Sequence, residues 1–150
     1  MRVSDLMTRN PAVCIASSSA QTAASLMKEN STGIIPVVED AYSRKLVGVV
    51  TDRDLCLAVV ATGRDPNHVW VRDCMTPDPV FCTPTDKSET VLELMQRHQV
   101  RRIPVVDVEK TLQGMVSLSD LVRRNAATNG ELFQALKKIF APKARAKKAA

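Results

Sequence analysis

The stretch GVVTDRDL at residues 48–55 occurs again, in altered form, as GMVSLSDL at residues 114–121. In both stretches an apolar run ends at a hydroxyl residue, and an aspartate follows three positions later. The apolar run predicts a short strand, and the hydroxyl residue with its aspartate predicts the first turn of a helix. The same strand-to-helix transition is therefore expected twice in one chain.

The two stretches belong to a longer internal repeat. When the chain is shifted by 68 residues, positions 3–38 align with positions 71–106, and 13 of the 36 aligned residues are identical. The aligned segments include VSDLMTRNPAVC with VRDCMTPDPVFC, and IIPVV with RIPVV. A two-residue contraction then changes the shift to 66, which aligns the two motif stretches. This degree of identity indicates two copies of one structural unit.

Both copies predict the same order of elements, β-α-β-β-α. The first helix of each copy is expected to begin at a capping pattern, Ser18 with Gln21 in one copy and Asp86 with Glu89 in the other. Short β-branched runs predict strands, and a second helix follows each motif stretch. The expected ranges are 11–15 and 79–83 for extended segments, 34–38, 46–50, 103–106 and 112–116 for strands, and 52–61 and 118–127 for the second helices.

The repeat also predicts how the chain is organised. A copy of about 60 residues is small for a core of its own, so we expect the copies to pack sheet to sheet about a pseudo-twofold axis. The predicted fold class is α/β of the α+β type, with two such repeats, a C-terminal helix over 131–140 and a basic tail. The expected domains are a first repeat at 1–62, a linker at 63–70, a second repeat at 71–127, and the C-terminal helix and tail at 128–150.

The net charge of +5 arises from the end of the chain. Residues 137–150 hold six of the 21 lysines and arginines and no acid, which leaves 15 bases against 16 acids elsewhere. Such a tail is expected to be a solvated end, or alternatively a contact to nucleic acid, an anionic membrane or an acidic partner. Aromatic residues make up only 3% of the chain, which argues against a nucleic-acid groove built on base stacking.

The cysteines and histidines show no metal-binding pattern. They are Cys14, Cys56, Cys74, Cys82, His68 and His98, and no two cysteines form a CxxC pair. We expect no metal site, and thiols that are buried and reduced. No apolar run is long enough to cross a membrane, and the first residues lack the apolar core of a signal peptide. The resulting expectation is a soluble, cytoplasmic protein.

The polar end of the motif is the strongest candidate for a binding site. Thr51, Arg53 and Asp54 lie where a strand is expected to meet a helix N-terminus, whose free N–H groups suit an anion or a ligand hydroxyl. An aspartate three residues after a hydroxyl is also placed to hold a vicinal diol, and Ser117 and Asp120 repeat that pair. Plain helix capping is the alternative interpretation.

The order and spacing of these motifs resemble the cystathionine-β-synthase-type (CBS) domain. The resemblance rests on DLMT, IPVV and the G-hydrophobic-hydrophobic-[Thr/Ser]-x-x-Asp pattern, and it covers roughly residues 1–127. Two such domains in tandem resemble a CBS pair, or Bateman module. The resemblance implies a regulatory sensor for AMP, ADP, ATP or S-adenosylmethionine, with the motif aspartate on the ribose hydroxyls. No cofactor is required, and whether magnesium accompanies the phosphates is left open.

The same resemblance implies that each cleft is built from both copies. The residues implied for the first cleft are Thr51, Arg53, Asp54, Val80, Phe81, Arg101 and Arg102, with Val80 and Phe81 facing the adenine. Three guanidiniums that converge on a phosphate would form charge-assisted contacts. A solvated strand end is the alternative for the two adjacent arginines.

The second cleft departs from this pattern. The residues implied for it are Ala12, Val13, Gly33, Ile34, Ser117, Ser119 and Asp120. A glycine and an isoleucine stand where the other copy has its paired arginines, and a serine replaces Arg53. We therefore expect weaker phosphate binding there; alternatively, this cleft prefers a less charged ligand, is empty, or serves only as structure.

Nothing in the sequence indicates catalysis. The two histidines lie in the linker and near a helix end, and the five glycines are too scattered for a phosphate-binding loop. We predict a non-catalytic regulatory module that senses adenine nucleotides and signals to an unidentified target protein by conformational change. The alternatives are a ligand-free interaction scaffold and a nucleic-acid adaptor that acts through the basic tail.

The resemblance also implies a homodimer of two CBS pairs. An apolar face on the second helices is available for an isologous contact, or alternatively belongs to the core; its residues are Leu55, Ala58, Val59, Leu121 and Val122. Nucleic acid is not the favoured partner, and no membrane partner is expected.

Overall fold

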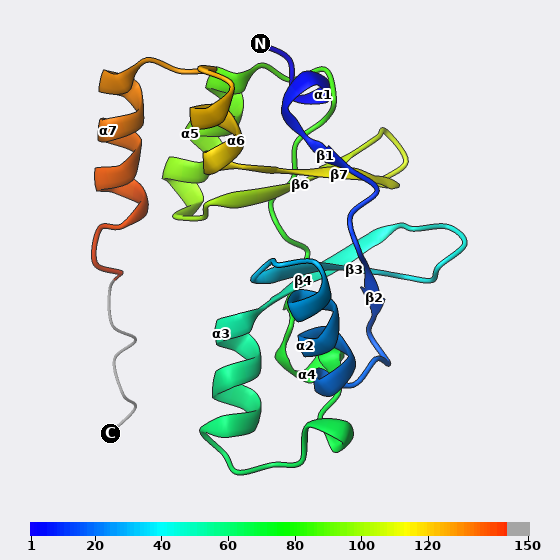
Figure 1. Ribbon diagram of the computed structural model, residues 1–150. Coiled ribbons are helices and arrows are strands. Elements are labelled where there is room, and N and C mark those ends of the chain that lie inside the picture. Colours follow the sequence, from blue (N-terminus) through cyan, green and yellow to red (C-terminus); the bar gives the residue numbers. More distant parts are fainter. Residues whose placement is uncertain (144–150) are drawn as a thin grey trace.

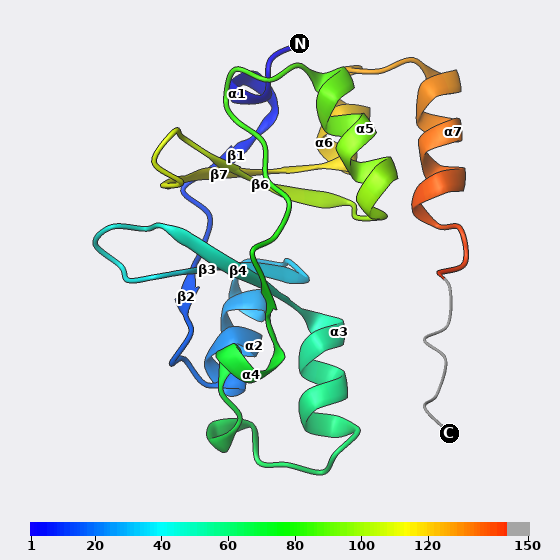
Figure 2. The same cartoon turned by 180° about the vertical axis from the view of Figure 1, so that it is seen from behind.

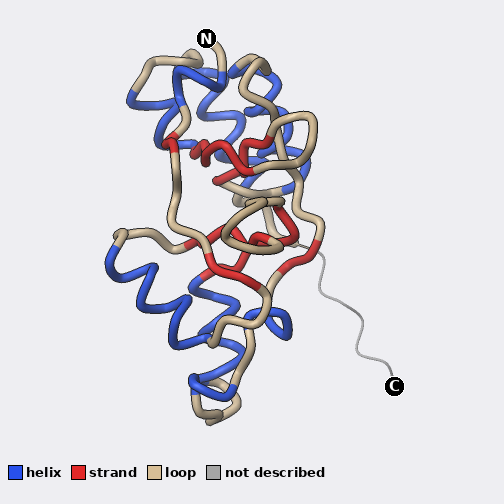
Figure 3. The backbone as a smooth tube through the Cα atoms, turned by 90° about the vertical axis from the view of Figure 1, so that its right-hand side faces the viewer, coloured by secondary structure: helices blue, strands red, loops and turns tan. Residues whose placement is uncertain are grey.

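The protein consists of two lobes, each with one β-sheet and its own helices (Figure 1). The computed structural model describes residues 1–143. The two sheets face each other in the middle of the molecule, and the helices lie on the outer side of each sheet (Figure 3). The predicted α+β fold with two repeats packed sheet to sheet is confirmed.

The first lobe has a four-stranded sheet in the order β2-β3-β4-β5. Strands β3 and β4 form an antiparallel pair, and β2 runs parallel to β3. The elements of this lobe are β2 (Cys14–Ile15), α2 (Ala20–Glu29), β3 (Ile34–Val38), β4 (Leu46–Thr51), α3 (Asp52–Leu55), its π-helical continuation η1 (Cys56–Val60), the 3-10 turn η2 (Pro66–His68), α4 (Val71–Cys74) and β5 (Thr76–Pro77).

The second lobe has a three-stranded sheet in the order β1-β7-β6. Strands β6 and β7 form an antiparallel pair that corresponds to β3 and β4 of the first lobe. The elements of this lobe are α1 (Val3–Leu6), β1 (Thr8–Arg9), α5 (Ser88–His98), β6 (Arg102–Val106), β7 (Leu112–Ser117), α6 (Leu118–Arg123) and α7 (Asn129–Ile139).

The leading residues of each repeat pack in the opposite lobe. Strand β1 pairs antiparallel with β7 of the second sheet, and β5 pairs antiparallel with β4 of the first sheet. Val3 and Leu6 of α1 are buried in the second core, whereas Val71 of α4 is buried in the first. Figure 2 shows the two crossing segments, one in blue and one in green, each running from one lobe to the other. Each lobe is therefore completed by the other repeat.

The glycine that begins each motif stretch allows this crossing. A Cβ atom on Gly114 would lie 2.7 Å from the carbonyl oxygen of Thr8, and one on Gly48 would lie 2.9 Å from the carbonyl oxygen of Thr76. Real Cβ atoms do not approach backbone this closely, and only glycine lacks the atom. The repeated glycine is thus explained by the strand that crosses over it.

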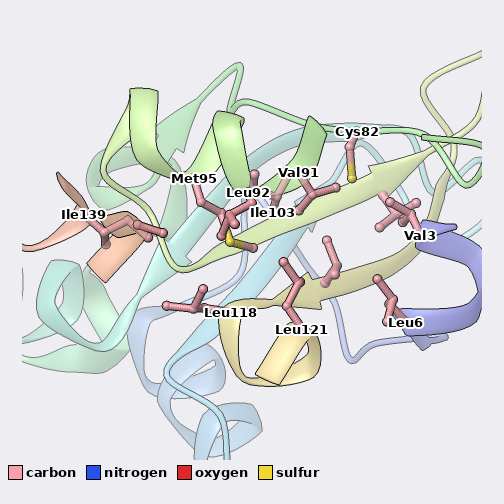
Figure 4. Close-up of a cluster of buried hydrophobic side chains, with 13 residues drawn as sticks. Val3, Leu6, Cys82, Val91, Leu92, Met95, Ile103, Leu118, Leu121 and Ile139 are labelled. Carbon is pink, nitrogen blue, oxygen red and sulfur yellow. The ribbon is translucent and has the colours of Figure 1, made fainter. Parts of the chain in front are cut away.

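Each lobe has its own hydrophobic core. Figure 4 shows the second core, in which α5 and α6 cover the buried side chains of β6, and Ile139 of α7 lies at one edge. Ile139 and Ala135 are both buried, so α7 is docked onto the second lobe. The first core has smaller helix residues, Ala20 and Ala23 of α2, packed with Val37 and Val50 of the sheet.

The predicted start of the first helix is wrong by one position in each copy. Ser19, not Ser18, caps α2, and Lys87 precedes α5 without a side-chain cap. Ser18 and Asp86 instead accept backbone N–H groups from three residues earlier, at 3.1 and 2.7 Å. The polar residue therefore stabilises the turn before the helix, because such side chains bond to nearby backbone in turns as readily as at caps.

The second helices and the C-terminal helix also differ from the expected ranges. Helix α3 continues to Val60 as a π-helix, whereas α6 ends at Arg123, before the expected end at residue 127. Helix α7 begins earlier than expected because Thr128 forms a capping box with Glu131. The basic tail is described only to Lys143, and its remaining residues lie outside the described part of the chain.

The apolar face expected on the second helices is divided between core and surface. Leu55 and Leu121 are buried in the two cores, so they are not available for an isologous contact. Ala58 and Val59 are partly buried and pack against the first core. Val122 is 51% exposed and is the member of the set that faces solvent.

Candidate functional site

Each motif stretch forms the same strand-to-helix junction. The Thr51 hydroxyl accepts the N–H of Asp54 at 3.1 Å, and the Asp54 carboxylate accepts the N–H of Thr51 at 2.9 Å. Ser117 and Asp120 form the same capping box between β7 and α6. Helix capping, the alternative interpretation, is therefore present in both copies, and it fixes the position of each aspartate at the end of its strand.

A large cleft opens between the lobes beside the first junction. We call it cleft 1, and its volume is about 830 Å³. Thr51, Arg53 and Asp54 line it from the first lobe, and Arg101 and Arg102 line it from the second. The structure thus brings the motif aspartate and the paired arginines, which are far apart in the sequence, to one cleft.

The segment expected to face an adenine is only partly in this cleft. Val80 lines cleft 1, but Phe81 lies beside a separate cavity of about 60 Å³, where the Lys110 ammonium is 5.8 Å from the centre of its ring. Neighbouring side chains of an extended segment point to opposite sides, so one of the two must face away. Phe81 is therefore outside the group of residues that the cleft brings together.

The end of helix α7 and the residues that follow it form a wall of cleft 1 that was not predicted. Ile139, Phe140 and Lys143 line the cleft, and the Arg101 guanidinium lies 5.5 Å from the centre of the Phe140 ring. The Gln99 side-chain amide donates hydrogen bonds to backbone carbonyls at the end of α7, at 3.1 Å each. The helical spacing predicted a C-terminal helix, but the sequence contains no signal for the surface on which this helix docks.

A smaller cleft lies beside the second junction. We call it cleft 2, and its volume is about 410 Å³. The predicted residues that line it are Ala12, Ile34, Ser117, Ser119 and Asp120. Arg102 also lines cleft 2, so this arginine borders both clefts.

Two residues predicted for the second cleft lie elsewhere. Gly33 lines cleft 1, where its Cα packs so closely against Asp52 that an added Cβ would lie 2.7 Å from the carboxylate. Val13 is not among the residues that line either cleft in the described part of the chain. The shift between the repeats aligns positions, but it does not fix which side of the backbone faces a given cleft.

Arg123 lines cleft 2 and was not among the predicted site residues. Its guanidinium forms an ion pair with Asp120 at 2.5 Å. Residues 1–143 contain no such ion pair to Asp54. A sequence signal for this contact was present, since an acid and a base three residues apart on a helix are neighbours on its surface.

Formal charge does not distinguish the two clefts. Four lysines and arginines and three aspartates line cleft 1, whereas two arginines and one aspartate line cleft 2, so each cleft has one excess positive charge. The clefts differ instead in size and in how their charges are paired. In cleft 1 the arginines are free of ion pairs within residues 1–143, and in cleft 2 one arginine is paired with the motif aspartate.

Comparison with known proteins agrees with this architecture. The family model of the CBS domain matches residues 3–61 and again residues 71–127. The chain belongs to the CBS-domain family. Its CBS pair is 41% identical over 119 residues to the CBS domain-containing protein YhcV of Bacillus subtilis, with 79% of this chain and 81% of that protein covered.

Solved structures of other CBS pairs have the same fold. The CBS-pair protein CBSX2 from Arabidopsis thaliana matches with a TM-score of 0.73 and 30% identity, over 83% of this chain and 93% of that one. A structure of CBSX2 in complex with AMP matches with a TM-score of 0.71 and 30% identity, over 83% and 95% of the two chains. Hypoxic Response Protein I with two coordinated zinc ions matches with a TM-score of 0.73 and 28% identity, over 82% and 98%.

The described part of this CBS pair offers no comparable metal site. Residues 1–143 contain no group of three or more His, Cys, Asp or Glu side chains placed to hold a metal ion. Burial raises the pKa of the Cys14 thiol to about 11 and that of Cys82 to about 12, so both stay protonated at neutral pH. Cys56 is exposed, contrary to the expectation of buried cysteines.

Within residues 1–143, no helix has the length and hydrophobicity needed to span a bilayer.

Proposed function

We propose that this CBS pair is a regulatory module that binds an adenine nucleotide in cleft 1. The ribose hydroxyls bind Asp54, the phosphates bind the guanidiniums of Arg53, Arg101 and Arg102, and the adenine packs beside Val80. The observation that carries the proposal is that these arginines and the motif aspartate, contributed by both lobes, line one cleft. The similarity to CBSX2, which has been solved with AMP, supports the class of ligand.

The chemistry of the cleft is suited to this ligand. Guanidiniums form charge-assisted and often bidentate hydrogen bonds to phosphate, and a carboxylate accepts hydrogen bonds from two neighbouring hydroxyls. The Asp54 carboxylate accepts one backbone N–H through its Oδ2, and its Oδ1 has no hydrogen-bond partner within residues 1–143. Asp54 therefore keeps acceptor capacity for a ligand while it caps α3.

The proposed output is a change in how the two lobes are held together. A ligand that contacts both lobes stabilises one arrangement of them only by its higher affinity for that arrangement. The changed surface is then recognised by a target protein, and two chains pair as a homodimer. AMP, ADP and ATP are the candidate ligands, with S-adenosylmethionine as the less charged alternative and magnesium as an accompanying ion to be tested. We propose no catalytic step.

Titration calorimetry with AMP, ADP and ATP tests this function. The variants are Asp54→Ala and Asp120→Ala, which are matched because each removes the carboxylate of a capping box. Only Asp54→Ala is expected to lower nucleotide affinity strongly, by about 10- to 100-fold, the effect of losing one charged hydrogen-bond partner. Equal losses in the two variants would contradict the assignment to cleft 1.

Absence of binding by the folded parent would favour the ligand-free scaffold. Thermal unfolding with millimolar nucleotide provides an independent measurement, because a ligand that binds the native state raises the melting temperature. The nucleic-acid alternative predicts binding that is lost when residues 141–150 are deleted.

A further inference from the structure

We propose that Arg123 is a specificity-determining residue that closes cleft 2 to adenosyl ligands by occupying the ribose-binding aspartate. Leu57, at the equivalent position of the first repeat, leaves the aspartate of cleft 1 free. This inference rests on the proposed function, and it predicts one nucleotide per chain rather than two.

The hydrogen bonds of Asp120 carry the first step. Its Oδ1 accepts from the Arg123 guanidinium at 2.5 Å, and its Oδ2 accepts from the backbone N–H and the hydroxyl of Ser117 at 2.8 and 2.6 Å. The Asp120 side chain is only 9% exposed. Both carboxylate oxygens thus already accept hydrogen bonds, and a ribose diol must compete with the guanidinium for Oδ1 of Asp120.

The first repeat lacks this contact at the aligned position. The shift of 66 residues that aligns Asp54 with Asp120 also aligns Leu57 with Arg123. Leu57 has no charged group, and this residue is 52% exposed. The acceptor that Arg123 occupies in cleft 2 is therefore open to a ligand in cleft 1.

The cost of displacing Arg123 gives the expected size of the effect. A charge-assisted hydrogen bond contributes enough to change affinity by about 10- to 100-fold. Arg123 has one alternative role, since it lines cleft 2 and its side chain is 73% exposed. If it turned away from Asp120 to bind a phosphate, removing it would weaken binding at cleft 2 instead of creating a site.

A reciprocal exchange tests the inference, with AMP as the probe and titration calorimetry of the full chain as the readout. The parent is expected to bind one AMP per chain, Arg123→Leu two, and Arg123→Lys one, because lysine retains the charge. Leu57→Arg is expected to lower the affinity of cleft 1 by about 10-fold or more, and Leu57→Met is its uncharged control. Melting temperatures without nucleotide show whether each variant is folded.

The outcomes separate this inference from the proposed function. Two AMP per chain in the parent, or an unchanged stoichiometry in folded Arg123→Leu, would overturn the inference while cleft 1 still binds. Unchanged affinity in Leu57→Arg would overturn the part assigned to Leu57. A parent that binds no AMP while Arg123→Leu binds one would uphold the closure of cleft 2 and contradict the proposed function of cleft 1.

Discussion

Cleft 1 and cleft 2 begin from the same motif and the same capping box, but they differ in what surrounds the aspartate. In cleft 1 the other repeat supplies Arg101, and α7 adds a wall that ends at Phe140. In cleft 2 the aspartate is paired with an arginine of its own helix, and the volume is about half as large. The comparison shows that a duplicated motif fixes the position of a cleft, whereas residues outside the motif set its size and the pairing of its charges.

The largest effect on AMP affinity is expected from substitution of Arg101 or Arg102. Arg101 lines cleft 1 alone, whereas Arg102 lines both clefts. Arg101→Ala should lower AMP affinity at cleft 1 by about 10- to 100-fold, because a charged partner of the phosphate is lost. In the Arg123→Leu background, Arg102→Ala should weaken both sites and Arg101→Ala only one, as measured by titration calorimetry.

Arg97→Ala is the control for these variants. Arg97 is an exposed arginine on α5 and is not among the residues that line either cleft. If it lowered AMP affinity as much as Arg101→Ala, the effect would come from the general positive charge of the protein. The distinction between the clefts would then lose its basis.

The two clefts differ, but the two lobes are alike where a crossing strand packs over the glycine of each motif stretch. Gly114→Ala is expected to lower the free energy of unfolding by about 1–3 kcal/mol, since its Cβ would push against the backbone of β1. Gly48→Ala should have an effect of the same sign through β5. Urea denaturation measures the free energy of unfolding of both variants.

Gly130→Ala in α7 is the control, because no atom lies within 4 Å of its added Cβ. This substitution should be neutral or slightly stabilising. Parent-like stability of Gly114→Ala would contradict the crossing geometry.

The order of elements was predictable because it depends on local patterns. Hydrophobic periodicity and the internal repeat indicated the strands and helices, and the resemblance to the CBS domain correctly grouped Asp54 with Arg101 and Arg102. The crossing of β1 and β5 was not predictable, because strand pairing between segments far apart in the sequence leaves no local signal. Phe81 is a different case, because side chains alternate along an extended segment, so Val80 and Phe81 do not both face the cleft.

Arg123 was missed because the alignment of the two repeats places it opposite a different residue type. Alignment of the copies draws attention to the positions that match, and Arg123 is opposite a leucine. The difference between the copies was nevertheless visible, since Asp120 and Arg123 have the spacing of a helical ion pair and Asp54 and Leu57 do not. Differences between repeats therefore indicated how the clefts diverge, and similarities indicated where they lie.

The smallest effect is expected from the wall that α7 adds to cleft 1. Phe140→Ala removes the ring beside the Arg101 guanidinium, which we expect to hold that guanidinium toward the cleft. An exposed cation–π contact changes affinity by about 2- to 5-fold, and titration calorimetry with AMP measures the loss at cleft 1.

Phe133→Ala is the matched control, because Phe133 lies within α7 and is also beside a cation, with the Lys137 ammonium 5.2 Å from its ring centre. Phe133 does not line cleft 1. Both variants remove an exposed aromatic ring from the same segment, so an equal change in AMP affinity would mean that α7 acts only through its stability. A loss confined to Phe140→Ala would mean that the end of α7 takes part in binding, and that cleft 1 differs from cleft 2 by a structural element as well as by its arginines.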